Sequence, residues 1–146
     1  MINISGNTYI DAVPLTFGLG TGQLLVLTEP ISFWGGIDAR TGQIVDAHHP
    51  QKGVYVTNKV MVLTSSRGSS TGSYVLLELM RAKIGPSAIV LTEPDGIICT
   101  GVLVGGETYD LALPVIQVPI SALTGLKSGV TGKVVSEENH AFLSLE

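Results

Sequence analysis

Cysteine is almost absent from this chain of 146 residues, which contains only Cys99. A single cysteine cannot close an intramolecular disulfide bond, so a disulfide-stabilised fold is excluded. It also cannot provide the several thiolate ligands of a zinc or iron–sulfur centre. Cys99 lies in an apolar segment, and we expect it to be a small core residue.

Charged residues are also few: they make up 14% of the sequence, and the net charge is −4. Because the Lys and Arg residues form no cluster, nucleic acid is not expected to be a partner. Apolar residues reach 45%, which is too many for a disordered chain. The low charge leaves much uncharged surface, which favours contact with another protein over a merely glycine-rich β domain.

Long apolar runs are missing as well. No stretch approaches the length of a bilayer span, and the first residues do not combine a basic segment with an apolar core. We therefore expect no membrane partner and a cytoplasmic location. The composition does not shift abruptly along the chain, so residues 1–146 are expected to form a single domain.

The segment Ser65–Ser73, called the serine loop below, is rich in hydroxyl groups: it holds five serines, Thr71, Arg67 and two glycines. It lies between an apolar run and a helix-like segment. A loop of hydroxyls and backbone N–H groups at the start of a helix can hold an anion, or can lower the cost of a negative charge on one of its own hydroxyls. The simpler interpretation is a capped turn, which would not require so many hydroxyls beside an arginine.

Two familiar motifs are missing from the serine loop. It lacks the Gly-Lys-Ser/Thr of a P-loop, and its one cation, Arg67, precedes both glycines, so nucleotide binding is not expected. It also lacks a Gly-x-Ser-x-Gly elbow, so a hydrolase is not expected. A binding cradle, a catalytic loop and a capped turn remain open.

Periodicity and turn residues predict a mixed α/β layer structure. A helix is predicted from Ser69 to Lys83, with Ser70 or Ser73 as its cap. A second helix is predicted at Ile97–Gly105 and a short one at Ile120–Leu126. Short apolar, β-branched segments predict strands at Leu24–Leu27, Val54–Val56, Lys59–Leu63, Ala88–Leu91, Val115–Val118, Lys133–Ser136 and Ala141–Leu145.

One short motif repeats along the chain. Val-Leu-Thr-Glu-Pro occurs at Val26–Pro30 and at Val90–Pro94, and residues 62–64 repeat its first three letters. Either similar strand ends arose independently, or these ends lie along one edge of a sheet, where α/β domains gather their sites. In the second case that edge would bring together residues 33–36, the serine loop and Pro94-Asp95-Gly96.

Two further blocks are candidate sites. Phe33-Trp34-Gly35-Gly36 holds the only tryptophan, followed by glycines that let a backbone approach closely; the alternative is a core tryptophan beside a turn. His48 and His49 precede a proline, but adjacent residues of an extended segment point to opposite sides, and no other ligands cluster nearby. A structured loop is therefore expected there, and no metal site is expected in this chain.

These blocks, in their order along the chain, resemble a known family. They are similar to the small subunit of aconitase X type dehydratases over about residues 22–119. The combination of Phe-Trp-Gly-Gly with Arg-Gly-Ser-Ser at this separation is specific, whereas either block alone would not be. The matching segments are Pro30–Asp38, Thr41-Gly42, His49-Pro50, Arg67–Ser73, Leu77–Leu79, Pro86–Leu91 and Glu93–Asp95.

The resemblance implies an α/β fold of the swivelling β/β/α type, like the mobile C-terminal domain of aconitase, with a mixed sheet or barrel and flanking helices. It implies that a larger aconitase X subunit binds an iron–sulfur cluster, and that both parts are fused in single-chain members. This chain would then be the swivel subunit alone, inactive without its large partner. Its single cysteine agrees with that division.

The implied reaction is the dehydration of a small hydroxy acid. Gly68-Ser69-Ser70 aligns with the catalytic Gly-Ser-Ser of aconitase, which assigns Ser69 as the base that takes the proton beside the carboxylate. A helix start would stabilise the alkoxide, and Arg67 would add positive charge. Aconitase has an arginine two residues after its catalytic serine, whereas this chain has Thr71, so the substrate carboxylate must be held differently. The implied substrate-binding or loop-supporting residues are Ser66, Arg67, Gly68, Ser70, Thr71, Phe33, Trp34, Gly35 and Gly36.

Two substrates are associated with the family: a phosphorylated mevalonate for archaeal heteromeric members, and cis-3-hydroxy-L-proline for bacterial and fused members. Trp34 and Arg67 resemble the bacterial type, since Leu and Lys at these positions would have indicated the archaeal one. We therefore favour hydroxyproline, with 1-pyrroline-2-carboxylate as the product. The small subunit of phosphomevalonate dehydratase is the alternative. A non-catalytic anion-binding or scaffold domain is the alternative from another class.

Overall fold

Seven strands close into a barrel in the computed structural model, which describes residues 6–146. Around the barrel their order is β1-β5-β4-β3-β2-β6-β7. The strands are β1 (Thr8–Thr16), β2 (Gly18–Val26), β3 (Val60–Leu63), β4 (Ala88–Leu91), β5 (Val115–Gln117), β6 (Thr131–Glu137) and β7 (His140–Leu145). The helices are α1 (Phe33–Gly36), α2 (Gly72–Arg81), α3 (Gly96–Tyr109) and the 3₁₀ helix η1 (Ile120–Gly125).

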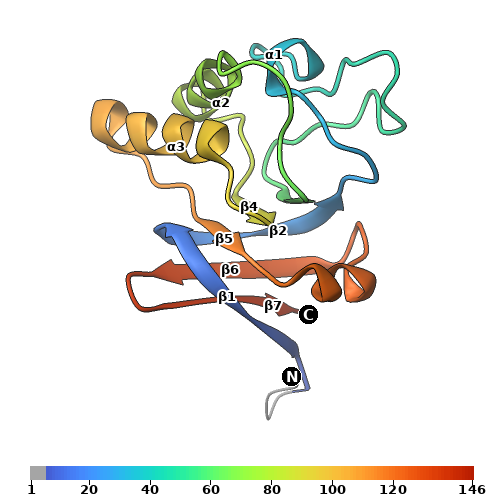
Figure 1. Ribbon diagram of the computed structural model, residues 1–146, viewed down its shortest axis with the longest axis vertical. Coiled ribbons are helices and arrows are strands. Elements are labelled where there is room, and N and C mark those ends of the chain that lie inside the picture. Colours follow the sequence, from blue (N-terminus) through green and yellow to red (C-terminus); the bar gives the residue numbers. More distant parts are fainter. Residues whose placement is uncertain (1–5) are drawn as a thin grey trace.

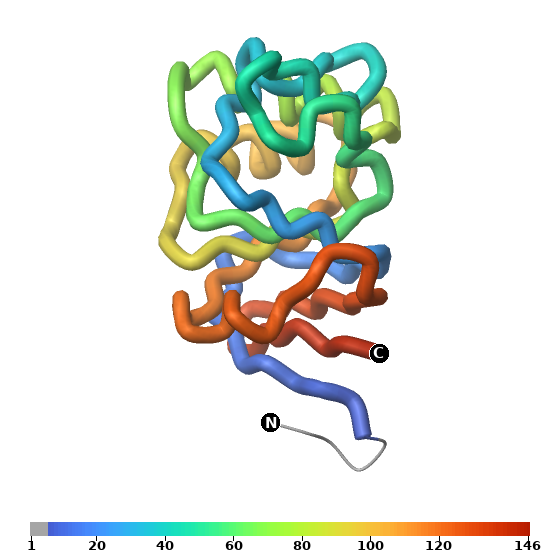
Figure 2. Tube along the Cα trace, turned by 90° about the vertical axis from the view of Figure 1, so that its right-hand side faces the viewer, coloured from blue at the N-terminus to red at the C-terminus, as the bar shows by residue number. Residues whose placement is uncertain are grey.

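The elements form three layers. Strands β2, β3, β4 and β5 lie parallel in one layer, whereas β6 and β7 pair antiparallel with each other and with their neighbours. Helices α2 and α3 cover the parallel strands on one side, and β6 and β7 lie on the other (Figure 1). The view turned by 90° shows the same separation (Figure 2). The predicted α/β fold class, with a barrel and flanking helices, is confirmed.

Two apolar cores occupy the spaces between these layers. Met61 and Leu63 of β3 pack in the core under the helices, whereas Val60 and Val62 pack inside the barrel. This division follows from the alternation of side chains along a strand. All four residues are fully or almost fully buried, as expected for a parallel strand covered on both faces.

Glycines let β2 pass close beneath the segments that lead into β3 and β4. A Cβ on Gly20 would overlap the carbonyl oxygen of Ser87, and one on Gly22 would overlap that of Asn58. The bare backbone allows the first part of β2 to pair with β6 while its end pairs with β3. These glycines also interrupt the apolar pattern, which is why only residues 24–27 were predicted as a strand.

The other predicted elements are largely present, with corrections. The predicted strand at Val54–Val56 is wrong, since there Tyr55 makes only an isolated bridge to Gln43. Strand β1 was not predicted at all. The predicted helix at Ile97–Gly105 is confirmed and runs on to Tyr109, and the segment at 120–126 forms η1. Within residues 6–146 no helix is long and apolar enough to cross a membrane.

Helix α2 begins later than predicted. Its first residue is Gly72, and its N-cap residue, Thr71, makes no side-chain capping hydrogen bond. Capping by Ser70 or Ser73 is therefore wrong. The Ser73 hydroxyl donates instead to the carbonyl oxygen of Ile97 in α3. The Gly85-Pro86 stop agrees with the observed end of the helix at Arg81.

Candidate active site

Three loops meet at the carboxyl edge of the parallel strands. Because β2, β3 and β4 are neighbours and run in the same direction, the loops that follow them leave the sheet at one edge. A bridge between Ile31 and Ser66 joins the loop after β2 to the serine loop, and the Arg67 N–H donates to the carbonyl oxygen of Ile31 at 3.1 Å. The interpretation that these strand ends share one edge is confirmed.

A shallow hollow opens between the serine loop and the start of α3. Its only charged side chains are Glu93 and Asp95, and hydroxyl groups line most of the rest. Arg67 and Ser69 are not in its wall and lie on the adjoining exposed part of the loop. The residues in the wall are Ser65, Ser66, Ser70, Ser73, Glu93, Pro94, Asp95, Gly96, Ile97 and Thr100.

Asp95 joins the serine loop to α3. Its Oδ2 accepts hydrogen bonds from both the N–H and the hydroxyl of Ser66, each at 2.6 Å. Its Oδ1 accepts from the N–H groups of Ile97 and Ile98, at 2.9 and 3.0 Å, and so caps α3. The residue is only 7% exposed, so all four bonds are largely shielded from water.

The Ser66–Asp95 pair is not an activated nucleophile. Burial raises the pKa of Asp95, but the hydrogen bonds from Ser66, Ile98 and Ile97 outweigh it, so the pKa lies below its ordinary value. A carboxylate with a lowered pKa is a weak proton acceptor and will not deprotonate a hydroxyl. The Ser66 hydroxyl therefore acts as a structural hydrogen-bond donor. Of the two roles predicted for Ser66, substrate binding or loop support, its contacts favour loop support.

The Ser69 hydroxyl lies where the chain turns into α2. It accepts a hydrogen bond from the Thr71 N–H at 3.1 Å and donates to the Thr71 hydroxyl at 3.0 Å. An N–H pointing at a hydroxyl oxygen favours the alkoxide over the neutral form, and the positive end of the helix dipole acts in the same direction. Both residues are exposed, so a substrate could reach this oxygen directly.

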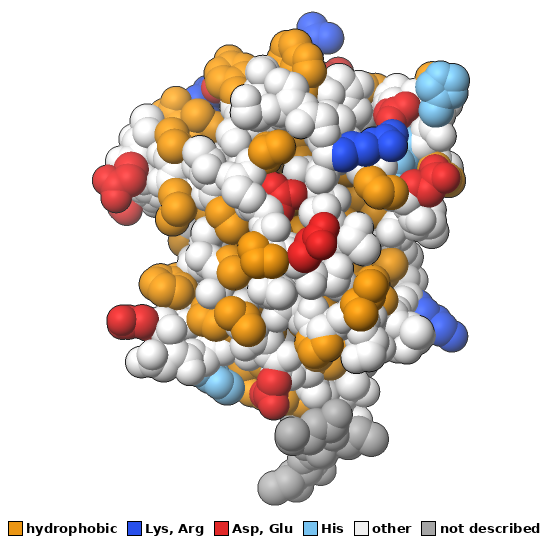
Figure 3. Space-filling view, viewed as in Figure 1, with side chains coloured by type: hydrophobic (Ala, Val, Ile, Leu, Met, Phe, Trp, Pro, Cys, Tyr) orange, Lys and Arg blue, Asp and Glu red, His pale blue; other side chains and the backbone are white. Residues whose placement is uncertain are grey.

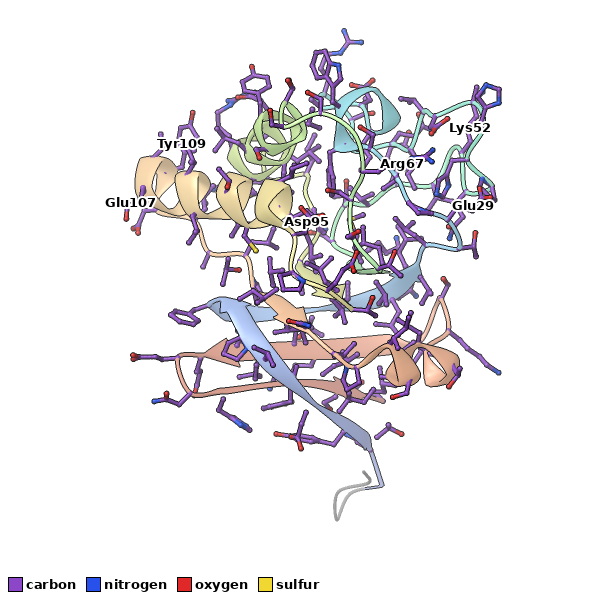
Figure 4. All side chains as sticks on the ribbon, in the orientation of Figure 1. Glu29, Lys52, Arg67, Asp95, Glu107 and Tyr109 are labelled. Carbon is purple, nitrogen blue, oxygen red and sulfur yellow. The ribbon has the colours of Figure 1, made fainter. Side chains whose placement is uncertain are left out.

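Arg67 offers an exposed positive charge beside the hollow. The ion pairs within residues 6–146 join Arg40 to Asp38 and Arg81 to Glu78, so the guanidinium of Arg67 has no carboxylate partner there. Arg67 and Asp95 appear in the same view of the upper layer, on neighbouring loops (Figure 4). The guanidinium is thus available to an anionic group of a substrate.

The Phe33–Gly36 block forms α1, a single irregular turn beside the serine loop. Phe33 is buried, whereas Trp34 is 55% exposed, so the alternative of a core tryptophan is wrong. Gly35 has a φ of +80°, which favours glycine. The block contacts the serine loop: a Cβ on Gly72 would lie 3.3 Å from the Cβ of Phe33, and one on Gly68 would lie 2.5 Å from the hydroxyl of Ser32, the N-cap residue of α1.

His48 and His49 do not form a metal site. His48 is exposed, whereas His49 is buried, with Nε2 3.1 Å from the carbonyl oxygen of Glu29 and Nδ1 accepting from the Gln51 N–H. His49 thus fixes the loop after β2, as the expected structured loop requires. The part of the chain that the structure describes contains no group of three or more His, Cys, Asp or Glu placed to hold a metal ion.

Asp95 was predicted only to lie at the shared sheet edge, and Ser73 only as a possible helix cap, whereas the structure shows that both connect the serine loop to the start of α3. An aspartate directly before an apolar helix is an N-cap signal, so the cap itself was readable from residues 95–98. Its second bond, to Ser66, joins residues 29 positions apart and depends on the packing of two loops. No local sequence pattern predicts such a contact.

Comparison with known proteins identifies the family. A family profile described as the aconitase X swivel domain matches residues 10–142. This chain belongs to that family. Crystallised aconitase X from Thermococcus kodakaraensis (holo-form) is 27% identical with a TM-score of 0.82, covering 95% of this chain and 98% of the solved one. The resemblance stated from the residue blocks is confirmed.

Relatives of this swivel domain carry two names. The cis-3-hydroxy-L-proline dehydratase of Pseudomonas aeruginosa is 41% identical over 101 residues, which cover 69% of this chain but 17% of that protein. The phosphomevalonate dehydratase small subunit of Methanothermobacter thermautotrophicus is 35% identical over 117 residues, 80% of this chain and 85% of that one. The chain thus spans less than a fifth of the first relative and most of the second.

Proposed function

We propose that this chain is the small, swivelling subunit of an aconitase-like hydro-lyase, in which Ser69 removes a proton from a hydroxy-acid substrate. The observation that carries this proposal is the Ser69 hydroxyl held at the entrance of α2 with the Thr71 N–H directed at its oxygen. Membership of the aconitase X swivel family supports it, as do the dehydratase names of relatives.

The chemistry requires help from charges. The alkoxide of Ser69 must form beside a hollow that already holds the carboxylates of Glu93 and Asp95, and like charges oppose it. The Thr71 N–H and the α2 dipole offset part of this cost, and Arg67 supplies positive charge to the substrate carboxylate. The remaining positive charge must come from the partner subunit, so the chain is inactive alone.

The preferred substrate is cis-3-hydroxy-L-proline, which loses water to an enamine that tautomerises to 1-pyrroline-2-carboxylate. Trp34 and Arg67 support this choice, because both resemble the bacterial type and both are exposed where a substrate could reach them. Phosphomevalonate is the second candidate, favoured by the small-subunit relatives that match this chain over most of their length.

An iron–sulfur cluster belongs to the partner subunit in this proposal. The only cysteine, Cys99, is half-buried against the core, and burial raises the pKa of its thiol, which disfavours the thiolate that a cluster requires. The residues of this chain therefore do not fit a cluster. A large aconitase X subunit is the partner that would carry it.

The exposed apolar surface of α3 supports a protein partner. Leu103 and Val104 are 58% and 43% exposed, and Phe17, 55% exposed, lies beside Leu103 at a depression under the helix. On the face of the molecule seen in Figure 3, apolar side chains, in orange, are scattered from the helical layer down to the barrel. Large apolar side chains exposed together on a helix mark an interaction surface, so α3 is expected to be covered in the assembled enzyme.

The charges in the hollow do not favour the alternative of a non-catalytic anion-binding or scaffold domain. A free anion would meet two carboxylates there, and the N–H groups at the start of α3 already bond to Asp95. A stand-alone anion-binding domain would need the opposite arrangement.

The experiment is reconstitution. The chain is co-expressed with a large aconitase X subunit from the same organism, the complex is purified anaerobically, and loss of water is measured with cis-3-hydroxy-L-proline and with phosphomevalonate. Activity on the first substrate is expected only in the complex. Activity on phosphomevalonate but not on cis-3-hydroxy-L-proline would make phosphomevalonate the substrate. Failure of any cluster-bearing subunit to bind would overturn the proposal.

A further inference from the structure

Two hydroxyls tie the serine loop to the first turn of α3. At one end of the loop, Ser66 donates to Asp95; at the other, Ser73 donates to the carbonyl oxygen of Ile97 at 2.5 Å. Residues 67–72 span the space between these two points. The position of Ser69 is therefore set by where α3 begins.

Close packing of α2 on α3 strengthens the second attachment. A Cβ on Gly72 would lie 3.2 Å from the Ile97 side chain, and one on Gly101 would lie 2.7 Å from the carbonyl oxygen of Ser73. This end of the loop is thus held by backbone packing as well as by a hydrogen bond. At the Ser66 end of the loop no glycine packs against α3 in this way. There the loop is held to α3 by the hydrogen bonds from Ser66 to the carboxylate of Asp95.

We propose that Asp95 is the positioning residue of the active site: its carboxylate, shared between the α3 cap and Ser66, fixes the serine loop so that Ser69 faces the substrate. This proposal rests on the proposed function, since it assumes that Ser69 is the reacting group. In this role Asp95 transfers no proton. Its effect is geometric, and a misplacement of about 1 Å commonly costs on the order of 100-fold in rate.

Replacement by asparagine separates the two tasks of Asp95. Asparagine is as good an N-cap as aspartate, so its side-chain oxygen can keep the bonds from Ile97 and Ile98. The NH₂ group then faces the N–H and hydroxyl of Ser66: the N–H loses its acceptor, and the hydroxyl loses its charged acceptor and can only accept from the NH₂ group. Asp95→Asn therefore loosens the serine loop from the start of α3 and preserves the helix start, while the bond from the Arg67 N–H to Ile31 remains.

The matched control is Asp46→Asn. Asp46 also accepts a bond from a backbone N–H two residues on, that of His48, but this contact stays within one turn. Ser66→Ala removes only the hydroxyl donor and leaves the N–H contact to Asp95. It should have a smaller effect in the same direction, and little further effect when combined with Asp95→Asn.

The first measurement is amide hydrogen exchange by NMR on the full chain, which requires no activity. In Asp95→Asn, exchange at Ser66 and Thr71 is expected to rise about 10-fold or more, because hydrogen bonds to a charged group are the strong ones. Exchange at Ile97 and Ile98 is expected to stay within a factor of about 3. An unchanged rate at Ser66 and Thr71, or an equal rise at all four, would overturn the proposal.

The second measurement is the kinetics of the assembled complex. Asp95→Asn should lower kcat by about 10- to 100-fold with a much smaller change in KM, whereas Asp46→Asn should leave both close to normal. Normal kcat in Asp95→Asn would overturn the positioning role. If the wild-type complex dehydrates neither substrate, the proposed function fails, and the exchange measurement alone decides whether Asp95 holds the loop.

Discussion

Ser69 and Thr71 are joined by two hydrogen bonds that run in opposite directions: the Thr71 N–H donates to the Ser69 hydroxyl at 3.1 Å, and this hydroxyl donates to that of Thr71 at 3.0 Å. In the resemblance to aconitase, Thr71 replaces the arginine that follows the catalytic serine by two residues. A hydroxyl cannot replace the charge of an arginine. It can orient the Ser69 hydroxyl so that its oxygen receives the backbone N–H.

Thr71→Val tests this orientation. The variant keeps the backbone N–H and removes the hydroxyl acceptor, so a neutral hydrogen bond worth about 1 kcal/mol is lost and kcat is expected to fall about 5-fold. Thr71→Ser should restore most of the activity. Steady-state kinetics of the reconstituted complex measures both, and equal activity of the Val and Ser variants would contradict the role of the hydroxyl.

Gly68→Ala should destabilise the contact between the serine loop and α1. Gly68 has a φ of +93°, and an added Cβ would lie 2.5 Å from the Ser32 hydroxyl. Gly35→Ala is the control, because its φ of +80° carries similar strain but no atom lies within 4 Å of its Cβ. Strain alone costs about 1–2 kcal/mol, and Gly68→Ala should exceed this in the free energy of unfolding by urea. Equal losses in the free energy of unfolding in the two variants would show that the loop can shift to accommodate the added Cβ, and would contradict the prediction.

The stability of the chain should fall in acid partly through Asp95. Because the folded-state pKa lies below the unfolded value of about 3.9, its stabilising contribution is present above that pH and is lost as the pH falls through the folded pKa. Urea midpoints measured from pH 6 down to pH 2 should therefore fall less steeply below pH 4 in Asp95→Asn than in the wild type. Parallel curves would contradict the assignment.

Leu103→Glu should prevent assembly. Leu103 is 58% exposed on α3, and a charge there would be desolvated under a partner chain. Val45→Glu is the control, because Val45 is also exposed but lies on the long loop between α1 and β3, away from α3 (Figure 1). Co-purification with the large subunit is the measurement. Normal recovery of the Leu103→Glu complex would exclude α3 from the interface.

The central strand–loop–helix unit could be predicted from the sequence because its signals are local. β3 and β4 are short apolar runs, and α2 shows helical spacing up to the stop at residues 85 and 86. β1 escaped prediction because it lies on the barrel surface, with Val13 54% exposed and Pro14 within the strand. Its place is decided by pairing with β5 and β7, which lie far along the chain: Thr16 pairs with Val115, and Thr8 pairs with Leu145.

The candidate site divides in the same way. The hydroxyls, the arginine and the glycines of the serine loop were visible in the sequence, and so was the family resemblance. The exposure of Trp34 and the bond from Ser66 to Asp95 were not, because both depend on how three loops pack at one edge of the sheet. Ser66 and Ser73 donate their hydroxyls to residues at the start of α3. The choice of base among the serines of the loop is thereby narrowed to the other three, Ser65, Ser69 and Ser70.

The most direct test of the central claim compares Ser69→Ala with Ser70→Ala in the complex with the large subunit. Ser69 carries the hydroxyl that receives the Thr71 N–H, whereas Ser70 lines the hollow. If Ser69 is the base, dehydration should fall by at least about 100-fold in Ser69→Ala with assembly intact, and much less in Ser70→Ala. Near-normal turnover by the assembled Ser69→Ala complex would contradict the account.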